Sequence, residues 1–139
     1  MWELVLILFF GKMVALTPEP ITLQVAAAEF TPEAPLRAIT SGAHLRVDVS
    51  KTVAAQDVES ARKQADLKFP AGCVRATLLT RGGISYPLNA QGVSYAPNSI
   101  ELTLSAEDGL PTDVDFARVR VSSCAQVEGA HVRWRNHKL

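Results

Sequence analysis

Apolar and polar side chains alternate along most of the chain beyond residue 20. The alternation is clearest in five stretches, where every second residue is apolar: 21–27, 45–49, 100–104, 119–121 and 132–134. Successive side chains of a β-strand point to opposite faces, so this period of two predicts strands with one buried and one wet face. Such strands are typical of antiparallel sheets. Segments 74–81, 84–88 and 93–96 are further, less regular strand candidates.

Turn-forming residues separate these strands. The strongest signal is Gly82-Gly83, because glycine reaches the positive φ angles that a tight two-residue hairpin needs. Other Gly, Pro, Asn and Asp residues interrupt the pattern at 31–32, 41–42, 89–92, 97–98, 108–111 and 128–129. About eight short strands with regular turns predict an all-β fold, an antiparallel β-sandwich of the immunoglobulin-like or jelly-roll type.

One segment departs from the alternation. Within residues 53–66, apolar side chains recur at intervals of three and four, namely Ala54, Val58, Ala61 and Ala65. This spacing places them on one stripe of a helix. We therefore predict a short helix over residues 53–66 that crosses one end of the sandwich. An extended conformation is the alternative, because alanine buries little apolar area.

The chain opens with an apolar run that shows no amphipathic period. Residues 4–16 are apolar apart from Gly11 and Lys12, and Thr17-Pro18-Glu19-Pro20 ends the run because proline does not continue a helix. As a helix, residues 2–16 would extend about 22 Å, less than the roughly 30 Å of a bilayer's hydrocarbon core. Bilayer thinning, a snorkelling Lys12 or a partner's helices would make up the difference. We interpret the run as an N-terminal transmembrane helix, a membrane anchor formed by Trp2, Leu4, Leu6, Leu8, Phe9, Phe10 and Leu16.

Two other interpretations of this run stay open. A cleaved signal peptide would use Leu4–Phe10 as its apolar region, but Glu3 stands where basic residues are expected, and the small residues Ala26–Ala28 lie far downstream. The run could also be a buried first strand or helix of the domain. On the anchor interpretation, the chain divides into an anchor or uncleaved signal segment at 1–16, a Pro-rich joint at 17–20 and a β-sandwich domain at 21–139.

Length and charge limit the class of protein. The chain has 139 residues, of which 47% are hydrophobic and 20% are charged, and 14 Lys and Arg balance 14 Asp and Glu. This length suits one domain. The composition excludes a disordered chain and a coiled coil, and the zero net charge argues against a strongly basic nucleic-acid binder.

Cys73 and Cys124 are the only cysteines. Each lies at the end of a predicted strand and shares its parity with polar neighbours, so both fall at the rim of the sheet. Cysteines at a rim can bridge neighbouring strands, and closing a loop of about 50 residues would stabilise the fold by roughly 4 kcal/mol in the chain-entropy account. We predict a Cys73–Cys124 disulfide, which would imply export; two reduced buried cysteines are the alternative.

No arrangement of residues predicts catalysis or metal binding. Serine is absent from any Gly-x-Ser-x-Gly elbow, and Gly82-Gly83 lacks the Lys-Ser/Thr of a phosphate-binding loop. His131 and His137 would lie roughly 20 Å apart on an extended strand, too far to share one ion. Asp113 and Asp115 are too few for a calcium loop. We therefore expect no enzymatic activity, no metal and no cofactor.

The C-terminal segment carries the densest positive charge. On a strand, Val132 and Trp134 would enter the core and the side chains between them would line the opposite face. That face is formed by His131, Arg133, Arg135 and His137, and Arg118 and Arg120 would widen it if their strand paired alongside. Anionic lipid headgroups or an acidic partner suit it better than nucleic acid, because it offers no aromatic side chain to stack on bases. The alternative is a solvated outer face of an edge strand.

These features favour a non-catalytic accessory or interaction subunit of a membrane or envelope complex. We expect the anchor to hold the β domain in the periplasm or outside the cell, with membrane lipid and other subunits of the complex as partners. Neither nucleic acid nor a particular small-molecule substrate is indicated. The alternative is a secreted or periplasmic binding module for a small ligand or glycan, with the leader cleaved near Glu29 and with Tyr86, Tyr95 or Trp134 as contact residues.

Overall fold

Ten β-strands and one helix are formed by the residues that the computed structural model describes, 13–96 and 99–137. In chain order they are β1 Met13–Ala15, β2 Ile21–Leu23, β3 Ala28–Phe30, β4 Leu36–Arg37, β5 His44–Asp48, α2 Val58–Lys68, β6 Val74–Thr80, β7 Ser85–Ala96, β8 Ser99–Ser105, β9 Asp115–Ser123 and β10 Val127–Arg135. The strands pair antiparallel throughout this part of the chain, so the prediction of an all-β antiparallel fold is confirmed.

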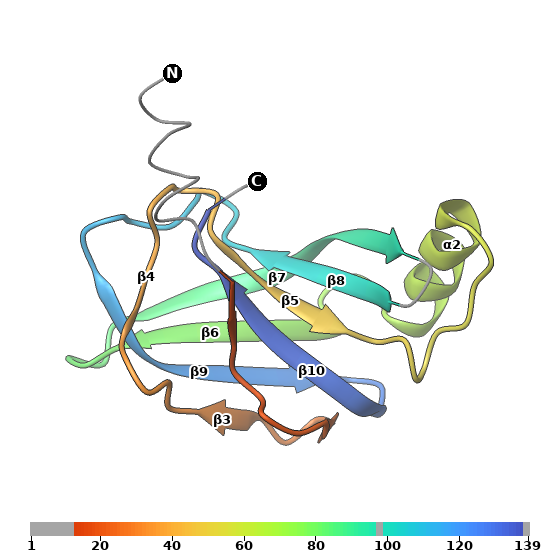
Figure 1. The fold of residues 1–139 in the computed structure, drawn as a ribbon, viewed down its shortest axis with the longest axis horizontal. Helices are drawn as coiled ribbons and strands as arrows, with labels where there is room; N and C mark the ends of the chain where they lie inside the picture. Colours follow the sequence, from red (N-terminus) through yellow and green to blue (C-terminus); the bar gives the residue numbers. More distant parts are fainter. Residues whose placement is uncertain (1–12, 97–98, 138–139) are drawn as a thin grey trace.

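Hydrogen bonds join the strands into one curled sheet rather than into two separate sheets. The order is β1-β10-β5-β8-β7-β6-β9-β3, with β2 also on β10 and β4 also on β9 (Figure 1). The backbone N–H of Ser123, on β9, donates to the carbonyl of Gln24 at 2.9 Å. Residues 21–30 therefore contact both ends of the sheet, because β2 pairs with β10 and β3 pairs with β9.

The apolar side chains that alternate along the predicted strands point into the curled sheet and form its core. Trp134 lies opposite Leu45 in the β10–β5 register, and Leu45 lies opposite Leu104 in the β5–β8 register. All three side chains are buried. The ring of Phe116, on β9, contacts those of Trp134 and Tyr86 edge-on, with centroids 6.1 and 5.5 Å apart. Apolar side chains from β5, β7, β8, β9 and β10 thus share one interior.

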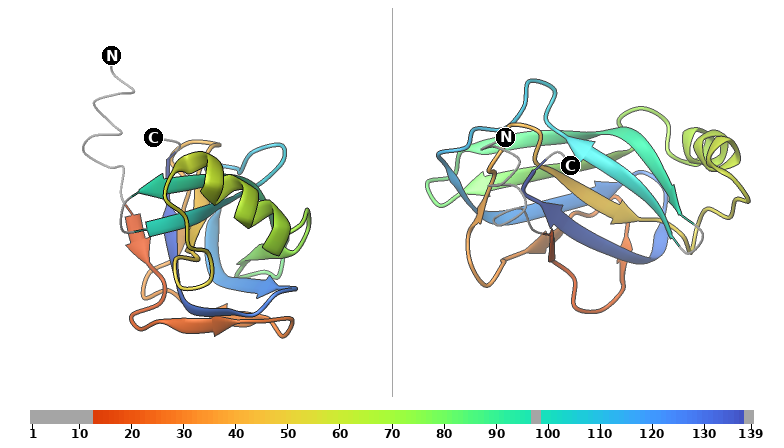
Figure 2. Two further views of the ribbon diagram at one scale, coloured as in Figure 1. Left: turned by 90° about the vertical axis from the view of Figure 1, so that its right-hand side faces the viewer. Right: turned by 45° about the horizontal axis from the view of Figure 1, so that its top comes forward.

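The predicted helix exists but begins later than the apolar spacing indicated. The Asp57 side chain accepts a hydrogen bond from the Ser60 N–H at 2.7 Å, which caps α2 and starts it at Val58. Ala61 and Ala65 are buried as predicted, whereas Val58 is 49% exposed. Residues 53–57 lie outside the helix because the cap precedes it. α2 covers one end of the curled sheet (Figure 2).

Two turn predictions change in detail. The Gly82-Gly83 turn connects β6 to β7, and Gly83 has a φ of +90°, but the Thr80 N–H donates to the carbonyl of Ile84, which makes the loop longer than two residues. The turn expected at 89–92 is instead a bulge inside β7, where the register with β8 shifts between Ala90 and Gly92. Small and amide residues suit a bulge as well as a turn, so composition alone did not separate the two.

The predicted anchor overlaps the domain at its C-terminal end. Met13–Ala15 form β1 against β10, and the Leu16 N–H donates to the carbonyl of Val132 at 2.9 Å. Leu16 is 9% exposed and belongs to the core, so its assignment to the anchor is wrong, because it continues the β1 pairing. Thr17 is also buried, with its Oγ1 accepting from the Val132 N–H. The other predicted anchor residues, Trp2–Phe10, lie outside the described residues. Within the described residues no helix has the length and apolar character needed to span a bilayer.

The predicted disulfide between Cys73 and Cys124 is confirmed. It joins the residue before β6 to the residue after β9, with Cα atoms 4.8 Å apart and a sequence separation of 51. The Cys124 N–H also donates to the Cys73 carbonyl at 3.0 Å. The bridge thus continues the β6–β9 ladder at its end, where the two strands already lie together.

Removing this disulfide is expected to destabilise the domain. The double variant Cys73→Ser, Cys124→Ser should lose about 2–4 kcal/mol of unfolding free energy, because the unfolded chain regains the freedom of the closed loop. Urea unfolding of both proteins measures this loss. A thiol reductant should bring the wild type to the stability of the variant and leave the variant unchanged; a loss below about 1 kcal/mol would contradict the expectation.

Candidate functional site

The six residues predicted to form one basic face fall into two separate groups. Arg118 and Arg120 lie on β9, between β6 and β3, and both form ion pairs with Glu29 at 3.3 and 3.5 Å. The others lie on β10 or just beyond it, where the neighbours are β1, β2 and β5. Arg118 and Arg120 would widen the β10 face only if their strand paired alongside it, and this condition is not met, because β9 and β10 are not paired.

The β10 group is completed by residues of β5 and β8 that the sequence did not single out. Across the β10–β5 ladder, Arg133 lies opposite Arg46 and Arg135 lies opposite His44. Together with one acidic residue of β8 these side chains form the arginine–histidine cluster, which consists of His44, Arg46, Glu101, Arg133, Arg135 and His137. The remaining predicted residue, His131, lies opposite Asp48 outside this cluster.

Glu101 is the counter-ion at the centre of the cluster. It is buried, and its carboxylate binds the guanidinium of Arg133 and lies 3.8 Å from Nη1 of Arg46. One carboxylate on β8 therefore serves one arginine on β5 and another on β10. A buried carboxylate is favourable only when it is paired in this way.

Arg135 is not neutralised in the same manner. No carboxylate among residues 13–96 and 99–137 forms an ion pair with it, and its Nε donates instead to Nε2 of His137 at 3.5 Å. Burial lowers the pKa of Arg135, and the nearby charges of Arg46 and Arg133 lower it further, while the more distant charge of Glu101 offsets part of this shift. Within the cluster, three guanidinium groups face one carboxylate, an excess of two positive charges. Asp48, the next residue of this face along β5, lies opposite Glu101 and accepts hydrogen bonds from Ser50 instead of pairing with an arginine.

The two histidines of the cluster make matching contacts through both of their ring nitrogens. His44 lies with its Nδ1 2.9 Å from the Gly42 carbonyl, and its Nε2 accepts from Nε of Arg46 at 3.3 Å. His137 repeats this arrangement with the Asn136 Oδ1 and Arg135. Burial is the main cause that lowers the pKa of each histidine, and the adjacent arginines lower both further; the contact with the Gly42 carbonyl opposes the shift of the His44 pKa without reversing it. A proton on either Nε2 would remove an acceptor and add a positive charge.

A second surface is an apolar groove between β1 and the segment that leads into β4. Its volume is about 680 Å³, and Trp134 is among the residues that line it although this residue is almost fully buried. The lining combines β1 and its continuation with a proline-rich strip, chiefly Val14, Leu16, Pro32, Pro35, Leu36 and Ile39. Within the described residues β1 pairs with β10 on one side only, and Val14 and Ala15 of β1 line the groove.

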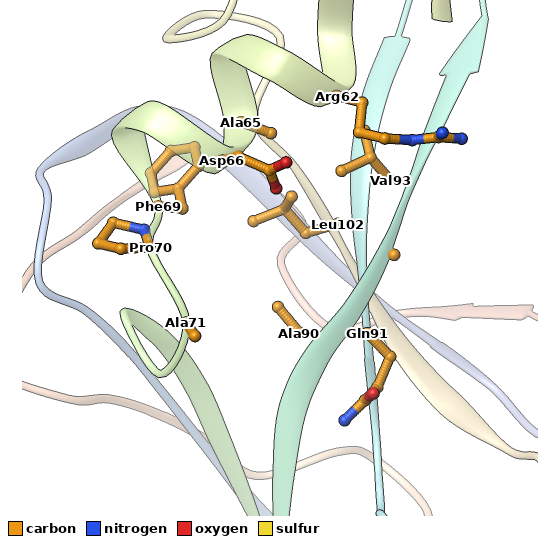
Figure 3. A pocket seen from close by; sticks show the side chains of 11 residues that line it. Arg62, Ala65, Asp66, Phe69, Pro70, Ala71, Ala90, Gln91, Val93 and Leu102 are labelled. Carbon is orange, nitrogen blue, oxygen red and sulfur yellow. The ribbon is translucent and has the colours of Figure 1, made fainter. Parts of the chain in front are cut away.

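A smaller pocket of about 310 Å³ lies between α2 and the bulge of β7 (Figure 3). Ala65 and Phe69 line it from the helix, Leu102 lines it from β8, and Arg62 and Asp66 supply charge on the helical side. The aromatic residues predicted to contact a ligand do not converge there. Tyr86 packs on Phe116, Tyr95 packs against the core, and Trp134 is buried. In the part of the chain that the structure describes, no group of three His, Cys, Asp or Glu could hold a metal ion.

The central role of Glu101 can be tested against an exposed carboxylate with the same number of arginine partners. Glu101→Gln should lower the unfolding free energy by about 1–3 kcal/mol, because two guanidinium groups lose a buried charged acceptor. Glu29→Gln is the matched control and should cost less than about 1 kcal/mol, since its pairs with Arg118 and Arg120 are solvated. Equal losses in urea unfolding would contradict this assignment.

Stability is expected to fall when the pH drops below the ordinary histidine pKa. Because the pKa values of His44 and His137 are lowered in the folded protein, the unfolded chain binds protons first as the pH falls. The stability due to their neutral forms is therefore present above about pH 6.5 and is lost as the pH falls through the folded pKa values. Urea unfolding at about pH 7.5 and about pH 5.5 measures the loss.

The double variant His44→Gln, His137→Gln isolates these two imidazoles from other acid-sensitive groups. It should lose less stability between the two pH values than the wild type does. His131→Gln, on the same sheet face but outside the cluster, should keep the full wild-type loss. A double variant that is as acid-sensitive as the wild type would contradict the prediction.

Comparison with known proteins assigns no family. No protein-family model, no curated protein and no solved structure matches this chain. The residues and contacts described above are therefore the basis of the function proposed below.

Proposed function

We propose that this protein is an exported, non-catalytic β domain held at a membrane by its N-terminal apolar segment, where it serves as an interaction subunit of a membrane or envelope complex. The observation that carries the proposal is the Cys73–Cys124 disulfide. Structural disulfides persist in oxidising compartments such as the periplasm and the cell exterior, and they are rare in the cytosol. An apolar run at the start of an exported chain fits either a signal or an anchor.

The contacts of residues 13–23 with the domain support retention of the N-terminal segment over its cleavage near Glu29. Cleavage near Glu29 would remove β1 and β2, whose hydrogen bonds to β10 run from Met13 to Leu23. Leu23 is fully buried and Leu16 nearly so, and losing two such side chains would open the core. The domain thus depends on residues that lie upstream of the small-residue cleavage pattern.

The partner is proposed to contact the apolar groove beside β1. A strand with a free edge over an apolar groove can accept an extended segment, with main-chain hydrogen bonds to the edge and apolar side chains in the groove. The short β1 and the proline-rich strip opposite it leave room for one such segment. The secreted ligand-binding module is the second candidate, favoured by the pocket beneath α2, and it requires a cleaved leader.

Membrane fractionation followed by intact-mass measurement tests the proposal. The full-length chain should sediment with membranes, and its mass should fall short of the reduced mass by two hydrogen atoms. Leu8→Asp should release the protein from the membrane, because a carboxylate in the middle of an apolar span costs about 2.5–3.5 kcal/mol. Val25→Asp is the matched control, since Val25 is an exposed residue of the domain. Full-length, reduced protein in the soluble cytosol would contradict the proposal.

A further inference from the structure

The arginine–histidine cluster has more positive charge than its one carboxylate can neutralise. Glu101 serves Arg46 and Arg133, while Arg135 contacts an imidazole instead of a carboxylate within the described residues. Unbalanced like charges on one face of a sheet are unfavourable, and an anion would relieve them. We propose that the Arg135 end of this cluster is a binding site for a phosphate group, carried by a small phosphomonoester or by a lipid headgroup.

Charge is the first reason for a phosphate group rather than a monoanion. Arg46, Arg133 and Arg135 against Glu101 leave two positive charges at neutral pH, when the imidazoles are neutral. A phosphomonoester carries between about 1.5 and 2 negative charges at pH 7 and offers three acceptor oxygens. Its charge therefore matches the excess of the cluster.

Donor geometry is the second reason. An arginine presents its N–H groups in a planar fork that suits phosphate oxygens, and only Nε of Arg135 has a partner among the described side chains. Arg46 stands on the neighbouring strand and on the same face, two register positions from Arg135, while His44 lies directly opposite Arg135. These donors come from paired strands, so the sheet register holds them together before any ligand binds.

Binding of the phosphate group should be coupled to uptake of protons by the histidines of the cluster. His44 faces Arg46, Arg135 and His137, and His137 faces Arg135 and Arg46. Two further segments lie near these groups. The loop at 106–110 carries the exposed acidic residues Glu107 and Asp108, and its Leu110 N–H donates to the Ser41 carbonyl. On β1, the residue opposite Arg135 is the uncharged Met13. A bound dianion would favour protonated imidazoles and raise their pKa values, so the protein takes up protons and binds more tightly as the pH falls.

Proton NMR of the full-length protein in a non-ionic detergent tests the site, because the chain has three histidines. Inorganic phosphate should shift the ring signals of His44 and His137 in a saturable way. His131 is the internal control: it lies four residues from Arg135 along β10, roughly 13 Å away, and should not shift. Sulfate is the second probe. It stays a dianion across the titration, so tighter sulfate binding at about pH 6 than at about pH 7.5 reports protons taken up by the protein.

The decisive variant is Arg135→Gln, which should weaken phosphate binding at least tenfold by removing a charged donor. Arg120→Gln removes an exposed arginine of β9 that pairs with Glu29; it is the control variant and should bind as the wild type does. The histidine signals of both variants report that the fold is kept. Unchanged affinity in Arg135→Gln, or equal weakening in both variants, overturns the proposal.

A vesicle arm separates the two sources of phosphate. Binding to phosphatidylcholine vesicles is compared with binding to vesicles that also contain phosphatidic acid, a phosphomonoester lipid. Retention that needs phosphatidic acid and falls about fivefold in Arg135→Gln but not in Arg120→Gln assigns the site to a headgroup. Saturable binding of free phosphate with the same variant pattern assigns it to a soluble phosphomonoester. Absence of both overturns the site without affecting the proposed tether, which phosphatidylcholine vesicles test separately.

Discussion

The pleat of β10 is the constraint on which much of the structure depends. Burying Val132 and Trp134 in the core forces the alternate side chains, Arg133 and Arg135, onto the outer face, and burial of Leu45 and Val47 does the same with Arg46 on β5. Pairing the two strands therefore places Arg133 beside Arg46 and Arg135 beside His44. The sheet accommodates these like charges with a buried carboxylate from β8. The core and the charged face are thus two results of one register.

The local parts of the fold could be predicted from sequence because they depend on near neighbours. Alternation along 45–49, 100–104 and 132–134 identified strands and their buried sides, and the parity of Cys73 and Cys124 identified a rim disulfide. Order in the sheet depends on partners far apart in the chain, and alternation carries no information about them. For that reason the single curled sheet, the bulge in β7 and the separation of β9 from β10 emerged only from the structure.

The candidate site likewise combines residues that local spacing predicts with residues that only strand pairing brings together. His131, Arg133, Arg135 and His137 were placed on one face by their spacing, whereas Arg46 and Glu101 join them through cross-strand pairing that no local pattern reveals. Leu16 illustrates the opposite error. It ends an apolar run that only Gly11 and Lys12 interrupt and so resembles its apolar neighbours in sequence, yet its hydrogen bond to Val132 places it in the core. Hydrophobicity alone does not tell a membrane from a protein interior.

The position of the disulfide bears on how the domain would withstand proteases outside the cytosol. β6, β7, β8 and β9 all lie between Cys73 and Cys124 in sequence, together with the exposed glycine turn at 82–83. A protease that cut this turn would leave both fragments covalently joined and still paired with their neighbours in the sheet. A nicked molecule of this kind would keep its shape, and the loss of one peptide bond would become visible only after reduction.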